Sequence, residues 1–246
     1  MKLNRRETLT LAAAASAAGV MGLALPAAAK EGDMIDQVRL MAPAGVPDKV
    51  AGNPDAKVTL IEYASPTCPH CAQFSNTVLE PLKQKYVEPG LVKLIIRPFA
   101  RNTLDAAIFM LAEAAAQAAD AGAAPAEADA SAESSAPAAA ESGFSPAAVA
   151  AYETVLATFF RTQDSWGISD KPLDAMKAVA FQLGFSEASF NEALTNQDLF
   201  AAIEQMRNQA MDDFGLEGTP SFYVNGKQLT GEKSLDELSA EIDPLL

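Results

Sequence analysis

The sequence predicts an α/β protein in which a block of helices interrupts a strand–helix–strand core. Residues 58–64 and 92–99 are rich in β-branched and aromatic residues, which is typical of buried strands, and a helical pattern lies between them. This order predicts a βαβ unit with parallel strands. Helical periodicity fills residues 103–214, and strand signals return only at residues 221–224, before an Asn-Gly turn. The predicted plan is therefore β-α-β, a helical block, then β-β-α.

Residues 1–29 have the pattern of a cleaved signal peptide. Arg5 and Arg6 precede an Ala- and Leu-rich run, which ends in the small residues 27–29. The paired arginines resemble a twin-arginine signal, although the residues that follow them are not the usual apolar ones. A membrane anchor or a core helix are the alternatives. The signal peptide predicts that the protein works outside the cytoplasm.

The overall charge limits the classes of partner. The chain has a net charge of −14, which argues against binding to nucleic acid or to anionic membrane surfaces. An acidic surface also keeps an exported protein soluble. We therefore expect no nucleic-acid partner.

Residues 30–56 are predicted to be an arm on the edge of the core, which itself comprises residues 57–102 and 215–246. The helix that follows the first strand has an apolar face of Phe74, Val78 and Leu82, and Pro81 should kink it. Residues 88–90, Glu-Pro-Gly, should end it.

Residues 103–214 are predicted to be the helical insertion. Within it, residues 120–143 consist almost entirely of Ala, Glu, Asp, Ser and Pro. Such a segment buries too little apolar area to offset its ordering entropy, so we expect it to be flexible, although its Ala-rich ends can extend the neighbouring helices. An arm that contacts substrates is the alternative. Trp166, the only tryptophan, is expected to be a packing residue.

The two cysteines and the single histidine lie together in Cys68-Pro69-His70-Cys71. Cys68 is placed where a strand is followed by a helix, and Pro69 fits the first helical turn. Free backbone N–H groups and the helix dipole should therefore favour a thiolate at Cys68. His70 can add a hydrogen bond or a charge, or it can be a solvent-facing loop residue. Outside the cytosol, such a pair is more often redox-active than structural.

Glu62 is the second informative residue of the first strand. Its neighbours are mostly apolar, so its carboxyl group should be buried and should need a partner. Arg97 on the next strand is one candidate, which would make Glu62 part of a structural ion pair.

These motifs resemble the DsbA-type periplasmic thiol:disulfide oxidoreductases of bacteria, within the thioredoxin-like fold superfamily. The resemblance is carried by residues 61–63, 68–71, 159–166 and 218–222, the last being Gly-Thr-Pro-Ser-Phe. It implies a thioredoxin-like fold with an inserted all-helical domain and a redox-active Cys68–Cys71 disulfide. Cys68 would be the attacking cysteine and Cys71 the buried resolving one. Pro220 would be a cis-proline that faces this disulfide, with Thr219 contacting an extended substrate peptide, and Glu62 would move the proton of the buried cysteine.

The predicted function is to donate the Cys68–Cys71 disulfide to reduced, unfolded exported proteins. The resemblance implies reoxidation by a membrane thiol oxidase of the DsbB type, and we expect a monomer without a cofactor. The acidic segment is a departure from the family, and the dimerisation domain of its isomerase branch is missing. The same site could instead work as a reductase or isomerase. A module that binds copper or zinc through Cys68, His70 and Cys71 is the alternative from another class, but a structural zinc site needs a fourth ligand.

Overall fold

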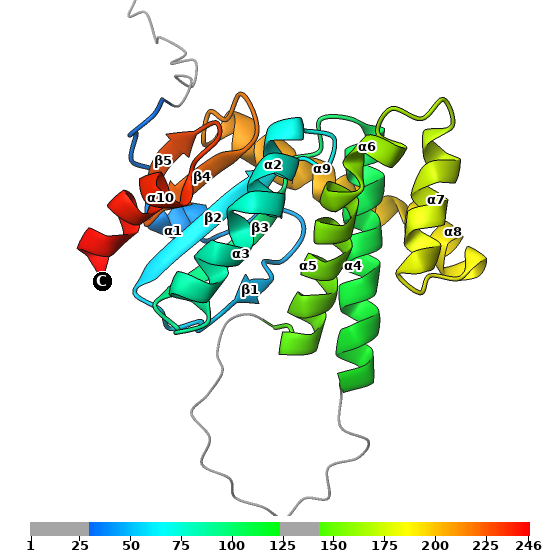
Figure 1. The fold of residues 1–246 in the computed structure, drawn as a ribbon, viewed down its shortest axis with the longest axis horizontal. Coiled ribbons are helices and arrows are strands. Elements are labelled where there is room, and N and C mark those ends of the chain that lie inside the picture. The colour runs from blue at the N-terminus through cyan, green and yellow to red at the C-terminus, as the bar shows by residue number, and fades with distance from the viewer. Residues whose placement is uncertain (1–29, 124–142) are drawn as a thin grey trace, which may run out of the picture.

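A computed structural model describes residues 30–123 and 143–246. Within them, five strands form one sheet in the order β1-β3-β2-β4-β5 (Figure 1). The strands β2 and β3 are parallel, and the other neighbouring pairs are antiparallel. The bounds of the strands are β1 Val50–Ala51, β2 Val58–Ala64, β3 Val92–Pro98, β4 Ser221–Val224 and β5 Lys227–Thr230.

Helices lie before, between and after the strands. They are α1 Gln37–Leu40, α2 Pro69–Thr77, α3 Leu79–Leu82, the π-helix η1 Lys83–Val87, α4 Thr103–Ala123, α5 Pro146–Arg161, α6 Gln163–Trp166, α7 Pro172–Gln182, α8 Glu187–Thr195, α9 Gln197–Asp212, α10 Leu235–Ile242 and the 3-10 turn η2 Asp243–Leu245. No helix of the described residues has the length and the apolar character needed to cross a membrane.

The first strand and helix form where the sequence predicts them. All seven residues of β2 are buried, which is expected of a central strand covered on both faces. The helical run after Cys68 breaks at Val78 and continues as α3 and η1. Pro81 has no N–H to donate to the carbonyl of Thr77, so the regular α-helical pattern cannot continue through this turn. At Asn225 and Gly226, positive φ angles of 47° and 89° make the tight turn of the β4–β5 hairpin.

Two apolar clusters fill the two sides of the sheet. On one side, Leu60 of β2 and Phe222 of β4 pack with α2, η1 and α10, and Phe74 meets Phe222 with ring centroids 4.7 Å apart. The other cluster joins Ile61 and Tyr63 of β2 to residues of the helical insertion. The insertion and the sheet therefore share one core.

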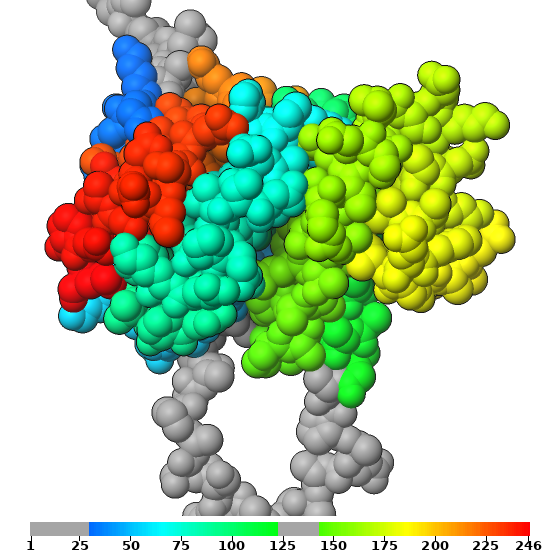
Figure 2. Space-filling view, in the orientation of Figure 1, coloured from blue at the N-terminus to red at the C-terminus, as the bar shows by residue number. Residues whose placement is uncertain are grey.

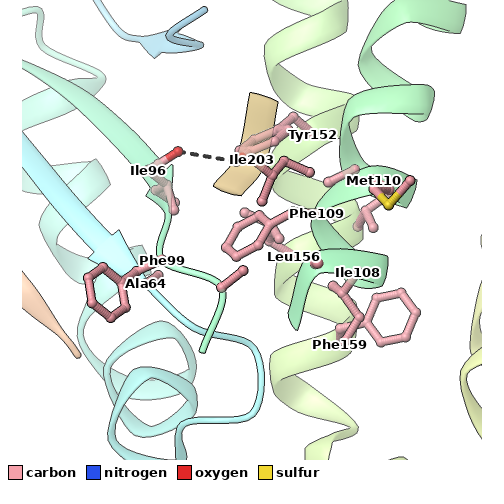
Figure 3. Packing of buried hydrophobic residues seen from close by; sticks show 14 of the residues in the cluster. Ala64, Ile96, Phe99, Ile108, Phe109, Met110, Tyr152, Leu156, Phe159 and Ile203 are labelled. Atoms are coloured by element: carbon pink, nitrogen blue, oxygen red, sulfur yellow. Dashed lines mark hydrogen bonds between the residues drawn. The ribbon is translucent and has the colours of Figure 1, made fainter. Parts of the chain in front are cut away.

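The contact between the insertion and the sheet is visible in Figure 3, where side chains of α4 and α5 pack beside the end of β3. The hydroxyl of Tyr152 on α5 donates to the carbonyl of Ile96 at 3.3 Å. Phe109 and Leu156 belong to the same buried cluster. In the space-filling view, α2 lies against α5, while α7 and α8 form the part of the insertion farthest from the sheet (Figure 2).

The N-terminal segment covers both edges of the sheet. Its strand β1 pairs with β3, and Met34 makes an isolated bridge with Lys227 of β5. Asp48 forms a buried ion pair with Arg97 at 2.6 Å. Next to it, Lys49 is ion-paired with Glu113 of α4, and both side chains are buried. The segment thus attaches the sheet to the helical insertion.

The predicted fold class, thioredoxin-like with inserted helices, is confirmed. At the start of segment 120–143, α4 continues to Ala123, which agrees with a helical extension at an Ala-rich end of this segment. Ala121 and Ala123 favour this extension, whereas Gly122 does not. The rest of this segment and the predicted signal peptide lie outside the described residues. The sequence prediction missed α6 and the π-helical form of η1.

Candidate dithiol site

Cys68 lies at the N-terminus of α2, as the N-cap residue. Its thiol donates a hydrogen bond to the carbonyl of Thr219 at 3.2 Å. Both Cys68 and Cys71 are buried free cysteines in this structure, with 2% and 0% of their surface exposed. The backbone N–H of Ser65 donates to the sulfur of Cys71 at 3.5 Å.

The two thiols have opposite acidities. The pKa of Cys68 is lowered to about 5, first because the thiol of Cys71 donates to its sulfur, and then through the Thr219 hydroxyl and the N–H groups of Cys71 and His70. These donors outweigh the effect of burial, which alone would raise the pKa. The pKa of Cys71 is raised far above its ordinary value, mainly by burial. One sulfur is therefore suited to be a thiolate and the other a thiol.

The peptide bond between Thr219 and Pro220 is cis, and this loop faces Cys68. The hydroxyl of Thr219 has no partner of its own among the described residues. It can therefore donate to the sulfur of Cys68 once the thiol has lost its proton, in agreement with its effect on the pKa.

The sequence left two roles open for His70, a donor of a hydrogen bond or a charge to Cys68 and a solvent-facing residue. Its imidazole is largely exposed, and its Nδ1 lies 2.8 Å from a carboxylate oxygen of Glu232, in the loop between β5 and α10. Glu232 is the main cause that raises the pKa of His70, and the charge of Cys68 is a smaller one. The side chain of His70 therefore bonds to Glu232, and its backbone N–H is the group that acts directly on the sulfur.

Glu62 is buried beneath this site, with 2% of its surface exposed. The alternative of a structural ion pair between Glu62 and Arg97 is wrong. In the parallel register Glu62 is opposite Ile96, so Glu62 and Arg97 point to opposite faces of the sheet. Arg97 bonds instead to Asp48 and to the hydroxyl of Tyr63.

The carboxyl group of Glu62 is left without a partner for Oε1 among the described residues. Burial, together with the charge of Cys68, raises the pKa of Glu62 to about 8. Glu62 also lines a cavity of about 270 Å³ between α2, α3 and α5, with Asn76 and Lys83 among its polar lining residues. Glu62 is therefore a carboxyl group that is protonated at neutral pH and lies next to a space wide enough for water.

The loop that carries Cys68 is held by a residue that sequence analysis did not single out. The buried carboxylate of Asp105, at the start of α4, accepts from the hydroxyl of Ser65 and from the N–H of Thr67, both at 2.7 Å, and from the N–H of Arg101. Gln163 of α6 donates to the carbonyls of Pro66 and Cys68. The insertion thus fixes the loop on which the reactive sulfur depends. An aspartate in the first turn of a helix looks like an ordinary dipole partner in the sequence, so no signal separated Asp105 from other acids.

Among residues 30–123 and 143–246, no group of three or more His, Cys, Asp or Glu side chains is arranged to hold a metal ion. The arrangement is instead a strand, a Cys-x-x-Cys helix N-terminus and a facing cis-proline loop. Fold and site together define a thioredoxin-fold protein with a dithiol centre.

Comparison with known families agrees with this class. A family model described as thioredoxin matches residues 45–140 and 126–244. The chain therefore belongs to the thioredoxin family. Among solved structures, a crystal structure of alpha-DsbA1 from Wolbachia pipientis superimposes with a TM-score of 0.67 at 24% identity, covering 86% of this chain and 96% of that one. This likeness establishes the DsbA-type fold, and the resemblance found in the sequence is confirmed.

Two curated relatives carry names from thiol chemistry. A candidate protein-disulfide oxidoreductase of Rickettsia conorii is 28% identical over 201 residues, which are 81% of this chain and 60% of that protein. The thiol:disulfide interchange protein DsbL of Escherichia coli is 28% identical over 192 residues, or 77% of this chain and 78% of that one. The chain thus spans only about 60% of the length of the rickettsial relative.

Proposed function

We propose that the protein is a thiol:disulfide oxidoreductase that donates the Cys68–Cys71 disulfide to reduced, exported proteins. The observation that carries the proposal is the contrast between the two sulfurs. The pKa of Cys68 is lowered to about 5, whereas that of Cys71 is raised. A thiolate that is stable in the reduced protein makes the disulfide a strong oxidant.

The first step is attack on the disulfide. A substrate thiolate attacks the sulfur of Cys68, the Cys68–Cys71 bond breaks, and Cys71 leaves with the electron pair. Because the pKa of Cys71 is raised, its sulfur takes up a proton. Glu62 is the nearby group that holds a proton at neutral pH, since its own pKa is raised to about 8. Glu62 then recovers its proton from water in the adjoining cavity.

The second step releases the product. A second substrate thiolate attacks the substrate sulfur of the mixed disulfide, and Cys68 leaves as a thiolate. Two substrate thiols have then been oxidised to a disulfide, and the protein has gained two electrons and holds a dithiol centre. The Thr219 hydroxyl and the N–H groups of His70 and Cys71 stabilise the leaving thiolate. The loop at Pro220 supports an extended substrate peptide over Cys68.

We further propose that the protein works in the periplasm, as a monomer, and is reoxidised by a membrane thiol oxidase of the DsbB type. The support is the predicted signal peptide of residues 1–29 and the DsbA-type fold. N-terminal sequencing of the protein recovered from a periplasmic extract tests the cleavage after Ala29. A protein that keeps Arg5 and Arg6 would contradict it.

The direction of exchange is tested by the reduction potential against glutathione, beside refolding of a reduced substrate and reduction of insulin. We expect a potential more oxidising than about −200 mV, with fast refolding and slow insulin reduction. A potential near that of thioredoxin, about −270 mV, would assign the site to reduction or isomerisation instead. Cys68→Ser is the control that abolishes either activity.

A further inference from the structure

A polar pocket of about 350 Å³ opens beside the cis-proline loop, on the side of β5. Its lining includes Thr219, Pro220, Gln228 and Gly231. The pocket shares Thr219 with the dithiol site, because the carbonyl of Thr219 lies 3.2 Å from Sγ of Cys68.

Gln228 and Thr219 are the described residues of the pocket that have a buried polar atom without a partner, and the Thr219 hydroxyl is directed to Cys68. The register pairs Gln228 with Tyr223 and Thr230 with Ser221, so these four side chains share one face of the β4–β5 hairpin, the face toward the pocket. Only 1% of the surface of Gln228 is exposed, yet its Oε1 accepts no hydrogen bond among the described residues. A buried amide oxygen without a donor is costly, so this atom is suited to a donor supplied by a ligand.

The other pocket groups restrict what that donor can be. The carboxylate of Glu31 is used, since it accepts from the N–H and hydroxyl of Thr230 and pairs with Lys233. Glu217 lies at the exposed rim, and Lys30 is the opposing positive charge. The oxygens of Gln228 and Glu217 favour a ligand that brings N–H groups, and they disfavour a carboxylate.

The wall of the pocket leaves room for a side chain. A Cβ atom added at Gly218 or at Gly231 would meet nothing within 4 Å. The N-terminal segment lies beside β5, where the N–H of Gly32 donates to the carbonyl of Gln228 (Figure 1). The pocket is therefore bounded by the cis-proline loop, by β5 and by the start of the N-terminal segment.

We propose that this pocket is a specificity subsite that binds an N–H-donating side chain, a carboxamide or a guanidinium, next to the reacting cysteine of the substrate. The proposal rests on the proposed function, because the occupant is part of a peptide held at Cys68. The subsite would select among reduced proteins by the residue beside the cysteine. Gln228 acts here as a specificity residue, and it does not touch the reacting sulfurs.

The test uses two-cysteine peptides that differ only at one residue, X, placed in turn at each of the two positions before and after the first cysteine. X is glutamine, arginine, norleucine or glutamate, and the rate of peptide oxidation by the full-length oxidised protein is measured. At one position, we expect glutamine or arginine to be faster than norleucine by about two- to tenfold, the effect of one net hydrogen bond. Glutamate should be the slowest. If high salt removes the higher oxidation rate of the arginine peptide relative to the norleucine peptide, and leaves that of the glutamine peptide unchanged, the occupant is charged.

Gln228→Met keeps the length of the side chain and removes its amide. We expect the ratio of the glutamine or arginine rate to the norleucine rate to fall to about one in this variant. Gln84→Met changes the same residue type in η1, far along the chain from the pocket, and should keep the ratio of the unmodified protein. If the occupant is charged, Glu217→Gln should lower the ratio of the arginine rate to the norleucine rate and leave the ratio for glutamine unchanged.

Equal rates for all four peptides at every position, or a ratio that persists in Gln228→Met, would overturn the subsite. If none of the peptides is oxidised, the proposed function fails first. The two failures are therefore distinguishable in one set of measurements.

Discussion

Cys68 and Cys71 are almost equally buried by surface area and yet have opposite acidities. Burial is the main cause that raises the pKa of Cys71, whereas hydrogen-bond donors lower the pKa of Cys68 in spite of burial. Cys68 is the N-cap of α2 and faces the N–H groups of His70 and Cys71, while Cys71 is one turn inside the helix. The two thiols are three positions apart in the chain, and this difference in position makes Cys68 a good acid and Cys71 a poor one.

The first prediction concerns the ionisation of Cys68. In the reduced protein, we expect thiolate absorbance in the ultraviolet to rise as the pH passes through about 5, several units below an ordinary cysteine. Cys68→Ser should remove this transition. A first transition above about pH 8 would contradict the stabilised thiolate and the oxidising role that follows from it.

The second prediction concerns the free energy of unfolding and Glu62. Its pKa is about 8 in the folded protein, against 4.5 for an ordinary glutamate, so the folded state prefers the protonated form. Stability from this group is complete below pH 4.5 and is lost as the pH rises through 8. Glu62→Gln keeps the shape and cannot ionise. We expect its advantage in urea unfolding over the unmodified protein to grow from about pH 5 to about pH 8 and then to level off.

Glu204→Gln, on the exposed surface of α9, is the matched control and should show no such growth. In kinetics, Glu62→Gln should slow reduction or reoxidation of the dithiol centre several-fold without unfolding the protein. Unchanged exchange rates would remove the proton-transfer role, and a pH-independent difference in stability would contradict the raised pKa.

At the scale of elements, strand alternation explains which parts of the site could be predicted. The sequence predicted β2, and with it the burial of Glu62, because residues 58–64 are rich in β-branched and aromatic residues on both sides of Glu62. It did not predict the relative register of β2 and β3, which places Tyr63 opposite Arg97 and Glu62 opposite Ile96. A shift of one residue exchanges the two faces of a strand, so the partner of a buried charge depends on the register.

The third prediction concerns the ion pair that attaches the N-terminal segment to β3. Arg97 has 1% of its side chain exposed, and its charge is balanced by Asp48 at 2.6 Å. Asp48→Ala leaves a buried guanidinium with only the hydroxyl of Tyr63, and should cost about 3–5 kcal/mol in the free energy of unfolding.

Asp213→Ala is the control for the loss of an aspartate from an ion pair. Its pair with Arg39 is 3.4 Å long and exposed, so its removal should cost less than about 1 kcal/mol. Urea unfolding of both variants measures the difference. Equal losses in the free energy of unfolding would mean that Asp48 does not neutralise the buried charge of Arg97.

At the scale of the whole molecule, the topology was predictable and the assembly of the site was not. The order of strands and helices follows from local periodicity, which the chain shows clearly on both sides of the insertion. The contact between Cys68 and Thr219 joins residues far apart in the chain, and only the resemblance to a family anticipated it. The bonds from Asp105 and Gln163 to the Cys68 loop depend on how the helical insertion packs, which no local pattern encodes.

The last prediction concerns the stability of the two redox forms of the whole protein. Oxidation removes the Cys68 thiolate and the donors that stabilise it lose their acceptor, so the reduced form should be the more stable one near neutral pH. A lowered pKa stabilises the folded reduced protein fully above the unfolded value of about 8.5, and this stability is lost as the pH falls through about 5.

The excess stability of the reduced form should therefore grow from about pH 5 to about pH 8.5 in paired denaturant melts of the two forms. The raised pKa of Glu62 affects both forms and largely cancels in the difference. Cys68→Ser, measured with and without reductant, should show no difference at any pH, since it cannot form the disulfide. If the oxidised form unfolds at the higher denaturant concentration at neutral pH, the disulfide is the favoured state. The protein would then act as a reductant and not as a donor of disulfides.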